Sequence, residues 1–379
     1  MKKNLAIITS HPIQYQVPLF QKLNKSKFLN VTVFFGSKHG YISKKKDLEF
    51  NKLINWNIKI LEGYKFFFSK KEKDVDSFWL SFSQLKKKFT EEKIDKVLIL
   101  GWNKVIYLQA IIISLRMGIP IYLRSENNLE KENTVLNRLI KKLLFNLFFK
   151  LFDKIFYIGK LNRYFYRYYG VSNDKLIFAP YFVDKNFFKS SVDINKIKII
   201  KKKLNLYNNE KIILFVGKLI DRKNPFLFIE YAKKILIKCK FLIVGNGPLL
   251  KSLKEKIKKE KINNVKIIGF KNQVEIANYY KLCDFLFLSS KYETWGLVVN
   301  EAFAMNKPCI VTNKCGSRKD LIDDFKTGVI IKTHYTNSSL NKILNLIKLN
   351  SPKFKKNIEK KNKLYSITHS FSAIEKNLK

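Results

Sequence analysis

The sequence predicts an α/β protein made of two doubly wound domains in tandem. Short apolar runs alternate with segments of helical periodicity along the chain, and the alternation occurs as two separate series. Strands that are apolar along their length, with helices between them, indicate parallel sheets covered on both faces. A chain of 379 residues is also too long for one ordinary core and suits two domains of roughly 170–190 residues each.

The first series of strands begins at the N-terminus. The apolar run from Leu5 ends at His11-Pro12, which is too short for the core of a secretory leader, so it is interpreted as a strand. The strands expected in this series are Leu5–Thr9, Val31–Phe35, Val97–Leu100, Ile119–Leu123, Ile155–Ile158 and Leu176–Phe178.

A second series of strands occupies the other half of the chain. Its expected members are Ile212–Val216, Phe241–Val244, Val265–Ile268, Phe285–Leu288, Cys309–Val311 and Val329–Ile331. Helical periodicity between strands is clearest in Val105–Met117, Pro225–Ile237, Val274–Leu282 and Leu297–Met305. No stretch reaches the ~18 uninterrupted apolar residues of a membrane span.

The predicted domain boundary lies in a Lys-, Asn- and Ser-rich stretch. We expect an N-terminal domain over residues 1–187, a linker over 188–210 and a C-terminal domain over 211–359, because a new strand begins directly after the linker. The basic segment at about 360–379 is compatible with a terminal helix that packs back on the first domain.

Composition excludes some classes of function. The net charge is +44, yet only seven of the 74 basic residues are arginine, the residue that base and phosphate readers favour. The charge therefore indicates a general attraction to anionic surfaces and no specific nucleic-acid binding. Four cysteines without a C-x-x-C pair or a histidine cluster indicate neither a zinc site nor a disulfide frame, as expected in the cytoplasm.

The segment after Phe285–Leu288 carries the clearest functional pattern. Glu293 stands in a polar turn, a helix is expected to open near Gly296, and Glu301 follows Glu293 by eight residues. Ligands of open α/β sheets bind at the carboxyl ends of strands, and a helix start attracts anions such as a diphosphate. The two carboxylates can accept hydrogen bonds from vicinal hydroxyls, as in a ribose or a sugar.

Two further strand ends carry polar loops. Gly217, Lys218, Arg222 and Lys223 follow Ile212–Val216, which places three cations at a strand–helix loop. Gly245-Asn246-Gly247 follow the next strand, where glycine permits close backbone approach. A solvated charge cluster and an ordinary turn remain the alternatives for these two segments.

The E-x7-E spacing of Glu293 and Glu301, together with the run Trp-Gly-Leu-Val-Val-Asn-Glu-Ala that begins at Trp295, resembles retaining glycosyltransferases of family 4, within the glycosyl transferases group 1. The similarity extends over most of the chain. It implies the GT-B fold, with two Rossmann-like domains facing across a cleft, and a hexosyltransferase-type activity that retains configuration without a cofactor or catalytic metal. The co-substrate would be a UDP- or GDP-sugar, and the acceptor a glycan or a lipid-linked glycan.

The resemblance also implies roles for individual residues. Glu301 would bind ribose hydroxyls, Glu293 sugar hydroxyls, and Lys218 and Lys223 the diphosphate. The family usually has arginine at the place of Lys218; lysine keeps the charge but loses the forked geometry, for which Arg222 can compensate. The other residues expected to bind the sugar donor are Gly217, Gly245, Asn246, Gly247, Gly296, Leu297 and Val298.

Acceptor recognition is expected in the first domain. The segment after its first strand resembles a subgroup met in polysaccharide and lipopolysaccharide assembly. The candidate residues are His11, Gln14, Tyr15, Trp102, Arg124 and Glu126. Many family members have a histidine near the position of Glu126, and this chain has none there. For His11, a capping or packing role is the alternative.

Two more patterns in the sequence each allow two interpretations. Asp74-Val75-Asp76 has the form of a metal-binding D-x-D, but no apolar strand leads into it, so a solvated turn is expected and no metal. Residues 137–156 combine a stripe of basic side chains with a wide Leu/Phe face, which suits an anionic membrane surface, here the inner face of the cytoplasmic membrane. The same pattern suits a helix packed on its sheet with its lysines in water.

Two other functions remain open at this point. The same fold serves sugar-nucleotide epimerases, although the E-x7-E pattern speaks against one. A basic protein that binds membrane or nucleic acid on an inactive transferase scaffold is the other alternative.

Overall fold

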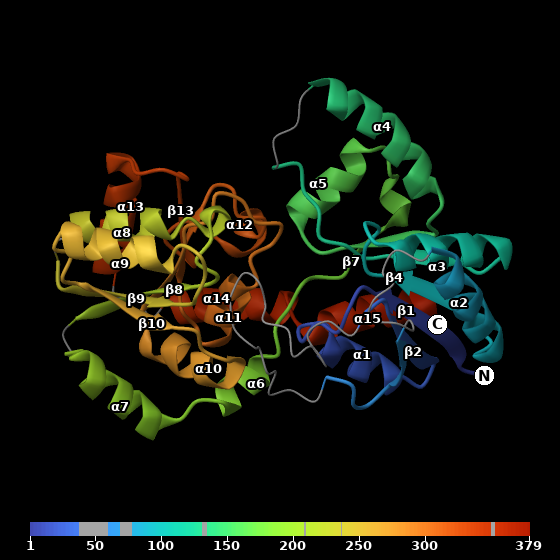
Figure 1. Cartoon of the computed structure of the whole chain (residues 1–379), viewed down its shortest axis with the longest axis horizontal. Helices are drawn as coiled ribbons and strands as arrows, with labels where there is room; N and C mark the ends of the chain where they lie inside the picture. Colours follow the sequence, from blue (N-terminus) through green and yellow to red (C-terminus); the bar gives the residue numbers. More distant parts are fainter. Residues whose placement is uncertain (38–59, 69–77, 131–134, 208–209, 236, 350–352) are drawn as a thin grey trace. The chain divides into compact units, whose positions relative to one another are not determined.

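The computed structural model describes residues 1–37, 60–68, 78–130, 135–207, 210–235, 237–349 and 353–379. These residues form two compact units (Figure 1). The first unit holds the described residues up to Phe182 together with Tyr365–Lys379, and the second holds those of Val183–Leu364.

A parallel sheet forms the centre of the first unit, with the order β3-β2-β1-β4-β5-β6-β7 among the described residues. Its strands are β1 (Lys3–Thr9), β2 (Leu29–Phe35), β3 (Lys65–Phe68), β4 (Lys96–Ile99), β5 (Ile121–Leu123), β6 (Lys154–Tyr157) and β7 (Leu176–Phe178). Its helices are α1 (Val17–Asn24), α2 (Phe78–Glu91), α3 (Val105–Arg116), α4 (Val135–Lys150), α5 (Lys160–Tyr168) and α15 (Ile367–Leu378).

The second unit repeats this architecture around a parallel sheet with the order β10-β9-β8-β11-β12-β13 in the described part of the chain. Its strands are β8 (Lys211–Val216), β9 (Cys239–Val244), β10 (Val265–Gly269), β11 (Phe285–Leu288), β12 (Cys309–Thr312) and β13 (Gly328–Ile331). Its helices are α6 (Lys185–Ser190), α7 (Ile194–Leu204), α8 (Pro225–Lys234), α9 (Leu250–Lys259), α10 (Gln273–Leu282), α11 (Val298–Ala304), α12 (Arg318–Leu321), α13 (Asn337–Lys348) and α14 (Lys353–Leu364).

The central strands are buried on both sides because helices cover both faces of each sheet. In the second unit, α8 and α9 lie on one face and α10 and α11 on the other (Figure 1). Leu214 and Leu286 on the central strands β8 and β11 are consequently fully buried. This explains why the strands show as continuous apolar runs in the sequence. The predicted α/β class is confirmed.

The predicted linker over 188–210 is corrected by the structure. The chain passes from the first unit to the second between Phe182 and Val183, and 188–210 carries the end of α6 and all of α7. Asp193 caps α7 by accepting hydrogen bonds from the Asn195 and Lys196 backbone N–H groups. Ile197 is the helix residue that is buried there, so the lysines that suggested a linker stay in water.

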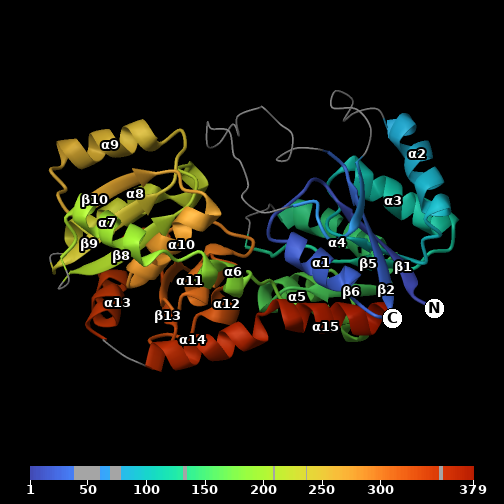
Figure 2. The same cartoon turned by 90° about the horizontal axis from the view of Figure 1, so that it is seen from below.

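The C-terminal segment joins the first unit, as expected. Tyr365–Lys379 belongs to that unit, and its helix α15 lies beside α1 (Figure 2). The Ser26 hydroxyl donates a hydrogen bond to Glu375 Oε1 at 2.5 Å. The side chains of Ile374 and Leu378 are fully buried.

Two other observations bear on the sequence predictions. Within the described residues, no helix combines the length and the apolarity that crossing a membrane requires. The four cysteines are unpaired and buried, and burial raises the pKa of the Cys315 thiol to about 11. Burial and a raised pKa make a thiol unreactive.

Candidate functional site

The order of the second sheet identifies one edge as the natural ligand site. Chain order reverses between β8 and β11, which are neighbours in the sheet. In open α/β sheets, ligands bind outside the carboxyl ends of the strands at this switch point. The loop after β8 carries Lys218, Arg222 and Lys223, and the loop after β11 carries Glu293.

Glu293 is the centre of a polar cluster built from these two loops. The Lys223 ammonium group forms an ion pair with Glu293 Oε1, and Arg222 Nη1 lies 3.2 Å from Glu293 Oε2. The Ser290 hydroxyl also donates to Oε1, at 2.8 Å. The structure therefore brings Glu293, Lys223 and Arg222 together, and their roles toward a ligand stay predictions. Ser290 was missed, because a serine at a strand end gives no signal of its own in the sequence.

The surroundings of Glu293 keep it ionised. The residue is 6% exposed, and burial by itself would raise the pKa of a carboxyl group. The charges of Lys223 and Arg222, with hydrogen bonds from Lys223 and Ser290, outweigh burial, so the pKa of Glu293 lies below its ordinary value. The site therefore holds a fixed negative charge between two cations.

Backbone contacts fix the two loops to each other. The Ser289 hydroxyl donates to the Lys223 carbonyl at 2.9 Å, and the Lys291 N–H donates to the Arg222 carbonyl at 2.8 Å. The cations are thereby held against the strand end that carries Glu293. Lys218 lies in the same loop, two residues beyond β8, and its side chain is half-buried.

The glycines after β9 serve the packing of these loops. A Cβ on Gly245 would stand 1.8 Å from the Gly217 carbonyl oxygen, so glycine is required there for two backbones to touch. At Gly247 the nearest atom to such a Cβ is the Leu219 carbonyl oxygen, at 2.6 Å. The Asn246 side chain accepts a hydrogen bond from the Gly247 N–H at 2.9 Å. A direct role of these three residues toward a ligand stays a prediction.

The turn between Glu293 and α11 is held by buried groups. Gly296 has a left-handed backbone, with φ of +95°, and a Cβ there would meet Leu288 at 3.0 Å and the Cys315 sulfur at 3.2 Å. The buried Trp295 indole N–H donates to Asn300 Oδ1 at 2.8 Å. Leu297 and Val298 are half-buried at the start of α11.

Glu301 lies inside α11 and is 3% exposed. The Tyr280 hydroxyl of α10 donates to Glu301 Oε2 at 2.5 Å. Sequence reasoning missed Tyr280, because a buried tyrosine in an apolar helix is indistinguishable from core in the sequence.

In the first unit, the segment after β1 places three candidates at the corresponding switch point, between β1 and β4. The His11 ring Nδ1 is hydrogen-bonded to Ser10 Oγ at 2.8 Å, and Tyr15 is half-buried. Gln14 is 7% exposed, and its side-chain oxygen has no hydrogen-bond partner among the residues that the structure describes. Acceptor contacts of these residues stay predictions.

The other three candidates of the first unit are engaged within it. Trp102 stacks on Phe165 with ring centroids 6.2 Å apart. Arg124 is 3% exposed, burial lowers its pKa, and its Nη2 donates to the Pro180 carbonyl at 3.1 Å. The Tyr181 hydroxyl donates to Glu126 Oε1 at 2.8 Å. Arg124 thus supports the loop at 179–181 rather than facing solvent, whereas Glu126 is exposed.

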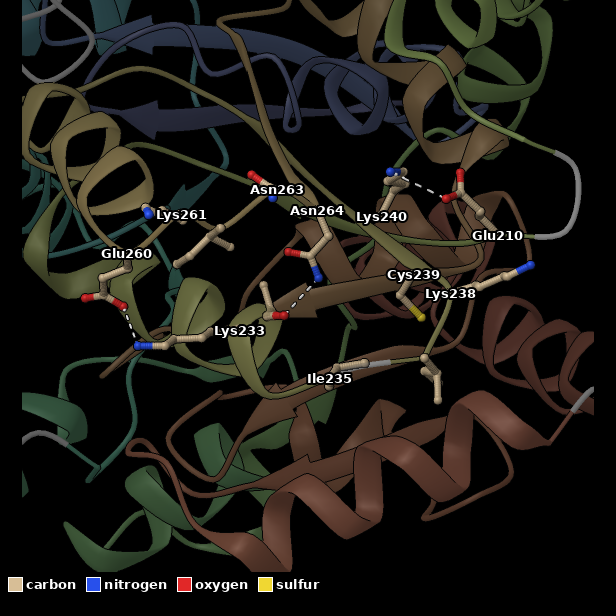
Figure 3. A pocket seen from close by; sticks show the side chains of 13 residues that line it. Glu210, Lys233, Ile235, Lys238, Cys239, Lys240, Glu260, Lys261, Asn263 and Asn264 are labelled. Atoms are coloured by element: carbon tan, nitrogen blue, oxygen red, sulfur yellow. Dashed lines mark hydrogen bonds and ion pairs between the residues drawn. The ribbon is translucent and has the colours of Figure 1, made fainter.

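A hollow of about 360 Å³ lies elsewhere on the second unit (Figure 3). Its lining includes Lys238 and Asn264, which immediately precede β9 and β10, so it opens at the amino ends of the strands. Two of its lysines pair with carboxylates, Lys233 with Glu260 at 3.0 Å and Lys240 with Glu210 at 3.4 Å. The hollow is therefore at the edge of the sheet opposite the Glu293 cluster.

The predicted absence of a metal receives no test from this structure. Asp74 and Asp76 lie outside the described residues. Where the chain is described, no three His, Cys, Asp or Glu side chains gather as a metal site would require.

Residues 196–364 match the family described as glycosyl transferases group 1. This segment runs from α7 to the end of α14 and contains Glu293, Glu301 and the three cations. The family match therefore supports the resemblance noted in the sequence for the part of the chain that carries the cluster.

This chain matches its curated relatives over about half of their own length. An uncharacterized glycosyltransferase of Methanocaldococcus jannaschii is 29% identical over 209 residues, which cover 54% of this chain and 58% of that protein. The UDP-Gal:alpha-D-GlcNAc-diphosphoundecaprenol alpha-1,3-galactosyltransferase of Escherichia coli is 31% identical over 193 residues, 46% of this chain and 48% of that protein.

Solved structures share the whole fold. Anabaena HepE in complex with UDP has a TM-score of 0.75 and 14% identity, covering 100% of this chain and 99% of that chain. A UDP-N-acetylglucosamine 2-epimerase has a TM-score of 0.60 and 14% identity, covering 100% and 96%. The GT-B fold class is confirmed, and at such identities the likeness shows the fold alone.

Proposed function

We propose that this chain is a glycosyltransferase that moves a sugar from a nucleoside diphosphate sugar, with UDP or GDP as the leaving group, to a glycan or lipid-linked acceptor. The observation that carries the proposal is the cluster at the β8/β11 switch point, where a buried carboxylate and two cations share one strand edge. The group 1 match over the same segment supports it. The name of the Escherichia coli relative, with a diphosphoundecaprenol-linked acceptor, supports the acceptor class.

In the proposed reaction, cationic side chains stabilise the negative charge of the leaving diphosphate. Lys223, Lys218 and Arg222 neutralise the diphosphate as it leaves, and backbone N–H groups at Gly296–Val298 add to this stabilisation. Glu293 accepts hydrogen bonds from hydroxyls of the transferred sugar and Glu301 from the ribose. Retention of configuration, hexosyl transfer and independence of a metal ion are part of the proposal on the strength of the family resemblance.

A nucleotide panel in a thermal-shift assay tests the nucleotide-binding part of this proposal. UDP or GDP at about 100 times its Kd is expected to stabilise the folded protein by about 2.7 kcal/mol, which raises Tm by roughly 5–10 °C for a unit of this size. Glu301→Gln is expected to reduce the shift from the nucleotide but not that from inorganic pyrophosphate, which has no ribose. If neither UDP nor GDP shifts Tm, the proposal fails.

Release of sugar separates the transferase from the two alternatives. A transferase is expected to hydrolyse its sugar donor slowly and to transfer the sugar when acceptor is present, whereas an epimerase returns an isomeric nucleotide sugar. An inactive scaffold binds membrane or nucleic acid and yields neither product. The epimerase among the structural neighbours shows that fold alone does not decide.

We also propose that the protein works in the cytoplasm, docked on the anionic inner face of the membrane through α4. The helix has two apolar faces. Phe149 on one face is buried in the core, and Phe148 packs against that core. The other face is exposed, with Leu143 at 67%, and its members are Ile140, Leu143, Leu144, Leu147 and, just past the helix end, Leu151. Packing on the sheet therefore accounts for the phenylalanines and leaves the leucines without a role.

Charge favours a lipid surface over a second protein copy as the partner of this face. Lys141 and Lys150 lie on the same helix, and two copies meeting there would bring like charges together. Leucines beside lysines match helices that lie in the interface of anionic bilayers.

Vesicle sedimentation tests the membrane proposal. The protein is expected to bind vesicles with about 30% phosphatidylglycerol and to bind phosphatidylcholine vesicles several-fold less, since each lysine near an anionic surface contributes about 1 kcal/mol. Leu143→Ser/Leu147→Ser is expected to lose most of the binding, while Ile199→Ser, an exposed residue of α7, serves as the matched control. Equal binding of the two lipids, or of the two variants, would contradict it.

A further inference from the structure

A buried hydrogen bond between Tyr280 and Glu301 connects two helices of the second unit, α10 and α11. The Tyr280 hydroxyl donates to Glu301 Oε2 at 2.5 Å. Tyr280 is fully buried and Glu301 is 3% exposed. A carboxylate taken out of water needs hydrogen bonds to remain charged, and a bond to a charged acceptor is roughly twice as strong as a neutral one.

Tyr280 is itself held in place. The edge of its ring packs against Phe188 of α6, with centroids 6.1 Å apart and planes at 76°. Its helix α10 begins with a capping box between Asn272 and Glu275. The Asn278 side-chain oxygen accepts a hydrogen bond from the Asp193 N–H at 2.7 Å, which ties α10 to the segment before α7. The hydroxyl therefore has a defined position relative to α11.

A fixed hydroxyl constrains the carboxylate that it contacts. The terminal torsion of a glutamate rotates broadly when nothing holds it. Anchoring Oε2 sets the plane of the Glu301 carboxylate, and with it the direction in which that group meets a ligand. Binding that depends on such preorganised groups weakens when the group is free to rotate.

We propose that Tyr280 is a positioning residue that orients Glu301 toward the ribose of the bound nucleotide. This inference rests on the proposed function, in which Glu301 binds the ribose. Tyr280 makes no contact with the ligand itself in this proposal, so its effect is confined to ligands that carry a ribose.

The test compares two hydroxyl deletions on neighbouring residues of α10. Tyr280→Phe removes the bond to Glu301 and keeps the ring, and Tyr279→Phe, at a position that is 5% exposed, is the matched control. Binding of UDP, GDP and inorganic pyrophosphate is measured by calorimetry. In Tyr280→Phe, the nucleotide that binds is expected to bind about tenfold more weakly, the loss of one hydrogen bond to a charged group, with pyrophosphate affinity unchanged.

Steady-state hydrolysis of the sugar donor supplies a second readout. Tyr280→Phe is expected to raise KM for the sugar donor about tenfold with kcat within about twofold, because uniform binding is lost without a change in the chemical step. Tyr279→Phe is expected to match the wild type. In Tyr280→Phe/Glu301→Gln, nucleotide affinity is expected to equal that of Glu301→Gln alone, since the two residues act as one unit.

The outcomes separate this inference from the proposal beneath it. If Glu301→Gln weakens nucleotide binding and Tyr280→Phe does not, Tyr280 has no positioning role. Equal loss of nucleotide and pyrophosphate affinity in Tyr280→Phe would show a purely structural role and overturn the inference as well. If Glu301→Gln leaves nucleotide affinity unchanged, the ribose assignment of Glu301 fails, and the positioning role fails with it.

Discussion

Replacing Lys223 with alanine is expected to lower kcat/KM for the sugar donor by about 100-fold or more, because one preorganised charge at a leaving group contributes on that scale. The same change leaves the buried Glu293 with Arg222 and Ser290 as partners. Removing one member of a buried ion pair costs about 3–5 kcal/mol when no other partner remains, so a smaller loss of stability is expected here. Donor hydrolysis rates and Tm measure the two effects.

A double variant separates chemistry from folding at this site. Lys223→Ala/Glu293→Ala removes both partners and is expected to regain part of the lost Tm, since no uncompensated buried charge remains, yet to stay inactive. Lys233→Ala provides the control, because Lys233 pairs with Glu260 beside the hollow at the opposite edge of the sheet. Activity in Lys223→Ala close to that of Lys233→Ala would refute the role given to Lys223.

Replacing Gly245 with alanine is expected to destabilise the second unit by about 3 kcal/mol, the upper end for overpacking in a well-packed region. The new Cβ would stand 1.8 Å from the Gly217 carbonyl oxygen, and backbone on both sides leaves no flexible atom to yield. Tm is expected to fall by roughly 6–12 °C. Nucleotide affinity is expected to fall as well, because the displaced loop carries Lys218, Arg222 and Lys223.

Gly269→Ala is the comparison for this effect. Gly269 lies on the same sheet, with φ of +88° and open space where a Cβ would be. Its replacement incurs backbone strain alone, about 1 kcal/mol. Chemical denaturation of both variants measures the difference. If Gly245→Ala is no less stable than Gly269→Ala, the close approach of the two loops does not require glycine.

The sheets could be predicted from the sequence because their signal is local. Phe285–Leu288 was predicted residue for residue as β11, since a strand buried on both faces is a continuous apolar run. The short strand β3 and helix α2 were not predicted. The segment 188–210 was misjudged because α7 buries one side chain, Ile197, and its lysines dominate the composition.

The cluster around Glu293 in the second unit could be predicted better than the surroundings of the candidate residues in the first unit, because its signal in the sequence is local. Glu293 and Lys223 follow strand ends directly, so neighbouring strands bring them together. The burial of Arg124 depends on carbonyls at 179 and 180, more than 50 residues away in the chain. The exposure of the α4 leucines depends on which side of that helix packs against the sheet, and a single sequence does not determine that side.

The two units differ in how the chain completes them, which bears on their synthesis. The second unit is built from one continuous stretch of the described chain, whereas the first also needs Tyr365–Lys379. The ribosome therefore releases all of the second unit before it releases α15. Until α15 has been synthesised, the side of α1 that it covers is exposed to water. Ser26 also lacks Glu375 as its hydrogen-bond acceptor until then. Domains commonly fold in order from the N-terminus during synthesis, whereas the first unit of this protein is complete only after the second unit has been made.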